Sequence, residues 1–96
     1  MASIELRTAA PDKARLLLRQ ALERERRLLC DAAARTRQKA NALASQTGVG
    51  IDALWAGLLP HPEGQDMDLL ELEGELELLK HIEEELRILE TLEICP

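Results

Sequence analysis

Aromatic residues, cysteines and long apolar runs are scarce in this sequence, and each scarcity excludes a class of protein. Trp55 is the single aromatic residue, so the chain lacks the stacking platform with which proteins bind single-stranded nucleic acid. The two cysteines, Cys30 and Cys95, are too few for a disulfide scaffold or a cysteine-rich zinc module. No apolar stretch approaches the ~18–20 residues of a membrane span, and the first residues lack the features of a secretory signal. We therefore expect a cytoplasmic protein with no membrane contact.

Glycine and proline are unevenly placed, and their positions divide the chain into two segments that favour helix. Four of the five glycines lie in the connector 47–67, together with two prolines. Pro11 suits the first turn of a helix, and Gly48 suits the left-handed residue that commonly ends one. We predict an all-α fold in a single domain, 1–96, whose helices 11–46 and 68–93 form a long antiparallel hairpin.

The start of the second helix and the connector carry further local signals. Asp68 followed three residues later by Glu71 predicts a capping box, with Met67 and Leu72 as its hydrophobic staple. A connector of this length is expected to be structured, with a short helix near 51–57 whose apolar residues, Trp55 among them, close the turn end of the hairpin.

Apolar spacing predicts which face of each helix is buried. In the first helix the apolar stripe follows steps of three, four and seven residues: Leu18, Leu22, Leu29, Ala33, Ala40 and Leu43. In the second helix the stripe is nearly continuous: Leu69, Leu72, Leu76, Leu79, Ile82, Leu86 and Leu89. Further apolar residues, including Leu78 and Leu92, lie outside this stripe. One partner helix covers one stripe, so the surplus predicts further packing partners.

The two helices are oppositely charged. Segment 12–46 holds nine cations against four anions, a net charge of +5, whereas segment 66–96 holds two cations against eleven anions, a net charge of −9. Complementary flanks of this kind set the orientation and choice of partner more than they set stability. Because the whole chain is acidic, at −6, and an acidic helix faces the basic one, we predict no nucleic-acid binding.

Three smaller features are candidate sites. His81 lies within three or four residues of Glu77, Glu84 and Glu85, but the glutamate three residues earlier that ferritin-like metal sites use is absent. A solvated face is therefore the better interpretation, and no metal or other cofactor is predicted. Cys30 is expected to be a small buried hydrophobe, about 20 Å from Cys95 and not disulfide-bonded to it. Gly74 marks either a close helix approach or a tolerated surface glycine.

The function that follows is a non-catalytic protein–protein interaction module: an adaptor, an assembly subunit or an oligomeric scaffold. No phosphate-binding loop, catalytic triad or zinc-protease motif is present, so enzyme activity is not predicted. We expect a homo-oligomer, most simply a dimer that forms a four-helix bundle. Two alternatives stay open: a metal- or ligand-binding bundle using His81, and a helical chaperone or anti-regulator of another protein. The expected interface comprises Leu72, Leu76, Leu78, Leu79, Leu86, Leu92 and Trp55.

Overall fold

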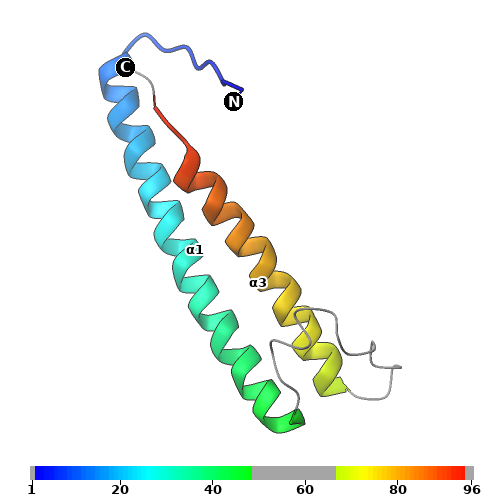
Figure 1. Ribbon diagram of the computed structural model, residues 1–96. Coiled ribbons are helices and arrows are strands. Elements are labelled where there is room, and N and C mark those ends of the chain that lie inside the picture. Colours follow the sequence, from blue (N-terminus) through cyan, green and yellow to red (C-terminus); the bar gives the residue numbers. More distant parts are fainter. Residues whose placement is uncertain (1, 49–66, 95–96) are drawn as a thin grey trace.

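The computed structural model describes residues 2–48 and 67–94, which form two long α-helices. Helix α1 spans Pro11–Thr47 and helix α3 spans Met67–Thr91. The two helices pack side by side in opposite directions, so that the end of α1 lies beside the start of α3 (Figure 1). The predicted all-α helical hairpin is confirmed. Apart from its two ends, the connector lies outside the described residues, as do Trp55 and the expected short helix at 51–57.

Both ends of α1 follow the sequence signals. Pro11 occupies the first turn, and Ala10 caps the helix without a side-chain hydrogen bond, while the Ala10 N–H donates to Thr8 Oγ1 at 3.1 Å. Gly48 ends the helix with a φ of 73°, and its N–H donates to the carbonyl oxygen of Ala44 at 2.9 Å. A positive φ at this position favours glycine, because a Cβ would crowd the backbone.

The start of α3 differs from the sequence prediction. The helix begins at Met67, so Asp68 lies inside the first turn and is not the N-cap that the expected pairing with Glu71 requires. Met67 is exposed and does not form a staple over the buried Leu72. The Asp68 carboxylate still lies where the helix dipole favours a negative charge. The helix ends at Thr91, two residues before the predicted end.

The core of the hairpin is a narrow seam between the two helices. Among the described residues, the fully buried side chains on α1 are Thr36 and Ala40, and those on α3 are Leu72, Leu76, Leu79 and Ile82. Leu43 and Ala44 cover the turn end of this seam. Small side chains of α1 therefore oppose the large ones of α3, which lets the two helices interlock. Thr36 also lies in the seam, although the predicted stripe passed from Ala33 to Ala40 without it.

Cys30 contradicts its expected place in the core. Its side chain is exposed, and its sulfur lies 4.0 Å from Nη1 of Arg26. The physical reason is helical rotation: Cys30 directly follows Leu29 of the core stripe, and one residue turns the side chain by about 100° toward solvent. Cys95, and with it the expected separation of the two cysteines, lies outside the described residues. Within those residues, neither helix combines the length and apolarity needed to cross a membrane.

Candidate interaction surface

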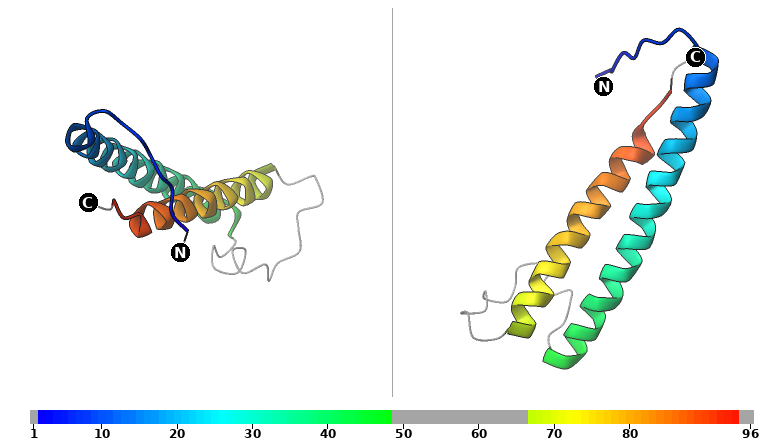
Figure 2. Two further views of the ribbon diagram at one scale, coloured as in Figure 1. Left: turned by 90° about the horizontal axis from the view of Figure 1, so that it is seen from above. Right: turned by 180° about the vertical axis from the view of Figure 1, so that it is seen from behind.

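The hairpin has two broad sides, and the types of residue on them differ. The residue before a core position points about 100° away from the core toward one broad side, and the residue after it points about 100° toward the other. Two antiparallel helices are related by a twofold axis perpendicular to their common plane. The same step on α1 and on α3 therefore leads to the same broad side of the hairpin. Figure 2 shows the two antiparallel helices from two further directions.

The residues that precede the core positions form the side that we call the apolar side. Its apolar members are Leu17, Ala21, Leu28, Ala32 and Ala42 on α1, and Leu78 and Ile88 on α3. The four large side chains are exposed to 64%, 58%, 48% and 56%, respectively. Leu92, directly after the end of α3, is also exposed. Both helices thus contribute large apolar side chains that the hairpin itself does not cover.

Charged residues on the apolar side are separated by helix. The α3 positions that precede the core carry the carboxylates Glu71, Glu75 and Glu85, and the corresponding α1 positions carry Arg35 and Lys39. On α3 the two cations fall elsewhere, because each directly follows a core residue. The apolar side is therefore acidic along α3 and basic along the turn-proximal half of α1.

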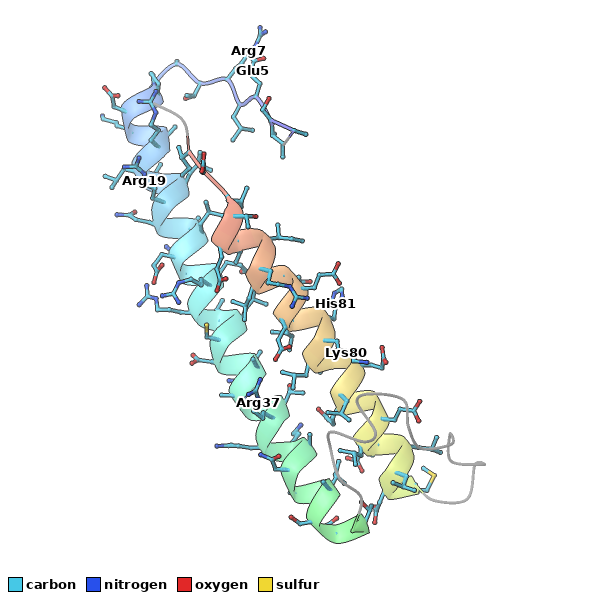
Figure 3. All side chains as sticks on the ribbon, in the orientation of Figure 1. Glu5, Arg7, Arg19, Arg37, Lys80 and His81 are labelled. Atoms are coloured by element: carbon cyan, nitrogen blue, oxygen red, sulfur yellow. The ribbon has the colours of Figure 1, made fainter. Side chains whose placement is uncertain are left out.

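The residues that follow the core positions form the opposite side, which we call the polar side. On α3 six of the seven are charged: Glu73, Glu77, Lys80, Glu83, Arg87 and Glu90; the other, Leu70, is apolar. Arg37 of α1 joins the two helices there through an ion pair of 2.8 Å to Glu83 (Figure 3). Lys80 lies 3.9 Å from Glu77 on the same side. Charged side chains dominate this side, although Leu70 on it is exposed at 39%.

The candidate metal cluster around His81 is only partly brought together. His81 Nε2 lies 3.0 Å from Glu85 Oε1, and both side chains are substantially exposed (Figure 3). Glu77 is directed to Lys80 instead. Within residues 2–48 and 67–94, no three His, Cys, Asp or Glu side chains are close enough together to hold a metal ion. The His81–Glu85 contact joins two residues one helical turn apart on the surface of α3.

A shallow hollow lies between α1 and the end of α3, at the open end of the hairpin, and sequence reasoning did not identify it. It is lined by Arg19, Leu22, Glu23, Arg26, Leu89, Leu92 and Ile94. Two hydrogen bonds, of 2.6 and 3.1 Å, tie Arg26 to Glu23 at its edge. The hydrogen bond from Arg26 lowers the pKa of Glu23, and the same contact raises the pKa of Arg26. Arg26 is exposed and lies in the seven-residue step of the stripe between Leu22 and Leu29.

The residues expected at an interface fall into two groups. Leu72, Leu76 and Leu79 are buried between α1 and α3, and Leu86 is half-buried. Leu78 and Leu92 are exposed instead. Trp55 lies outside the described residues.

Sequence reasoning missed Leu17 and Leu28, which extend the apolar side onto α1. The signal was available, because each directly precedes a leucine of the predicted stripe.

Comparisons with protein-family models, with curated proteins and with solved structures gave no match to this chain. The interpretation of function therefore rests on the surface itself.

Proposed function

We propose that this protein is a non-catalytic protein–protein interaction module that acts through its apolar side and associates with itself. The observation that supports the proposal is the gathering of Leu17, Leu28, Leu78 and Ile88 on one broad side, each about half exposed or more. The corresponding positions on the opposite side carry Arg19, Cys30, Lys80 and Glu90, of which three are charged. A protein that functions as a monomer in water does not need one broad side more apolar than the other.

The energetic argument is the burial of apolar surface. Full burial of a leucine side chain contributes about 1.5–3 kcal/mol. Each side chain of this group is already half-covered, so a partner that covers the rest gains roughly 1 kcal/mol from each. Single exposed leucines are normal on soluble proteins, whereas aligned groups of them mark interaction sites. The narrow seam inside one hairpin leaves room for such a gain.

A dimer is the simplest assembly that covers the apolar side. Two hairpins stacked through these sides give four helices around one core, which is the architecture of a four-helix bundle. In that bundle the seam of each hairpin is extended by the side chains that now point at solvent. A twofold assembly uses the same patch on both copies, so one self-complementary surface is enough.

Sedimentation of the wild type and of two leucine variants tests the proposal. We expect the wild type at tens of micromolar to sediment at twice the chain mass of 10.7 kDa. Leu78→Glu places a charge in the apolar side and should yield monomers, because an unpaired charge is costly in a dry interface. The matched control is Leu70→Glu, since Leu70 is also exposed, at 39%, but points away from both α1 and the apolar side. It should remain a dimer.

A monomeric wild type would contradict self-association. The apolar side would then be a surface for a different protein, as a helical chaperone or anti-regulator requires. A wild-type dimer that both variants leave intact would show that the copies meet elsewhere.

A further inference from the structure

We infer that the second copy lies with its turn in the same direction as the first, so that α1 of each chain packs against α3 of the other. This inference rests on the self-association proposed above and specifies its geometry. It follows from the charges of the two helices and from the positions of the residues on the apolar side.

Two twofold arrangements stack one apolar side on another with the helices aligned. A twofold axis parallel to the helices places α1 over the partner's α3 and keeps both turns at one end. A twofold axis perpendicular to the helices, in the plane of the interface, places α1 over the partner's α1 and puts the turns at opposite ends. In both arrangements every neighbouring pair of helices is antiparallel. Helix dipoles therefore do not distinguish them, and side-chain charges must.

The net charges of the helices favour the parallel axis. Helix α1 carries nine cations and four anions, and helix α3 carries nine carboxylates and two cations. With the parallel axis, positive and negative helices alternate around the bundle, and each helix touches only helices of opposite net charge. With the perpendicular axis, each helix also touches its like-charged copy. Like charges placed side by side oppose association and suppress that pairing.

The rows of charge on the apolar side agree with this choice at residue level. Ala40 packs in the same cluster as Leu72 and Leu76, so Lys39 lies at the height of Glu71 and Glu75. An axis parallel to the helices preserves height along the bundle. It therefore brings Lys39 of each copy level with both carboxylates on the facing helix of the other copy. The perpendicular axis would instead set the acidic row of α3 against a second acidic row.

Spin labels on the open end of α1 distinguish the two arrangements. The labelled variant is Lys13→Cys in a background that also carries Cys30→Ala and Cys95→Ala, so that each chain bears one label. Lys13 is exposed and lies 16 residues from the middle of α1, at residue 29. With the turns together, the two labels lie across the bundle diagonal, about 15–30 Å apart at the usual helix spacing of 8–10 Å. With the turns opposed, the axial separation is about 50 Å at 1.5 Å per residue.

Pulsed electron–electron double resonance on the dimer measures the distance between the two labels. Circular dichroism verifies that the variant is folded. A distance below about 30 Å supports the shared direction of the turns. A distance near 50 Å overturns the inferred geometry and leaves self-association intact. The absence of any distance between chains, together with a monomer in sedimentation, overturns both this inference and the proposed self-association.

Discussion

Gly74 within α3 and Gly48 at the end of α1 should respond to the same substitution in opposite directions. Gly74 lies within α3, and a Cβ built there meets no atom within 4 Å. Gly48 also has open space around its Cβ position, but its φ is +73°. Space is therefore equal at the two sites, and only the backbone conformation differs. Substitution by alanine isolates the contribution of that conformation.

The expected magnitudes follow from the backbone at each site. Inside a helix, alanine is favoured over glycine by about 0.8–1.0 kcal/mol, so Gly74→Ala should stabilise the hairpin by about 1 kcal/mol. A left-handed residue with a Cβ costs roughly 1–2 kcal/mol, so Gly48→Ala should destabilise it by a similar amount. For a chain of this size, 1 kcal/mol shifts the melting temperature by about 4–8 °C.

Urea unfolding, followed by circular dichroism at 222 nm and at one fixed protein concentration, measures both changes. Fixed concentration is needed because association would make the stability depend on concentration. A destabilised Gly74→Ala variant would refute the assignment of Gly74 as a tolerated surface glycine, since some group would then have to approach it closely. A neutral or stabilised Gly48→Ala variant would refute the argument from positive φ.

Three further predictions follow from the core and from the ion pairs. Leu72→Ala should cost about 2–5 kcal/mol in urea unfolding, because Leu72 is fully buried at the turn end of the seam; a loss below 1 kcal/mol would contradict this. Arg37→Gln should cost less than about 1 kcal/mol, because its ion pair with Glu83 is largely exposed, and this cost should vanish in 1 M salt. Carboxyl NMR titration should give Glu23 a pKa below its ordinary value of 4.5, and Arg26→Gln should raise it. Because the folded pKa is lowered, this pair stabilises the fold above that ordinary value and loses its contribution as the pH falls through the folded pKa.

The helices could be predicted from the sequence because their end signals are local. Pro11 and Gly48 determine where α1 begins and ends through their own backbone restrictions, and the structure places both as predicted. The start of α3 was wrong by one residue, because a capping box is a pattern of short side chains that also suits the first turn. Asp68 serves the helix dipole equally well from inside the helix.

The surface was harder to predict than the fold, because it depends on small rotations. Cys30 was expected in the core, yet it lies one residue beyond the core stripe and is exposed. Leu17 and Leu28 lie one residue before that stripe and were overlooked. Both errors have the same cause, because residues next to each other in the sequence point to different sides of a helix. One residue step separates a core position from the apolar side or from the polar side. Once the core residues are known, counting from them places Cys30 on the polar side and Leu17 and Leu28 on the apolar side.

The uneven depth of the seam gives an independent reason to expect a partner on the apolar side. Near the turn, alanines of α1 let Leu72 and Leu76 come close, and the seam is dry. Toward the open end, leucines of both helices are only half-buried. Two helices alone leave the flanks of such leucine pairs exposed, as the half-burial of Leu29 and Leu86 shows. A second hairpin would enclose this end, so association should protect the amide protons near Leu29 and Leu86 more than those near Ala40. If dilution to the monomer changed hydrogen exchange equally along both helices, this argument for the placement of the partner would be wrong.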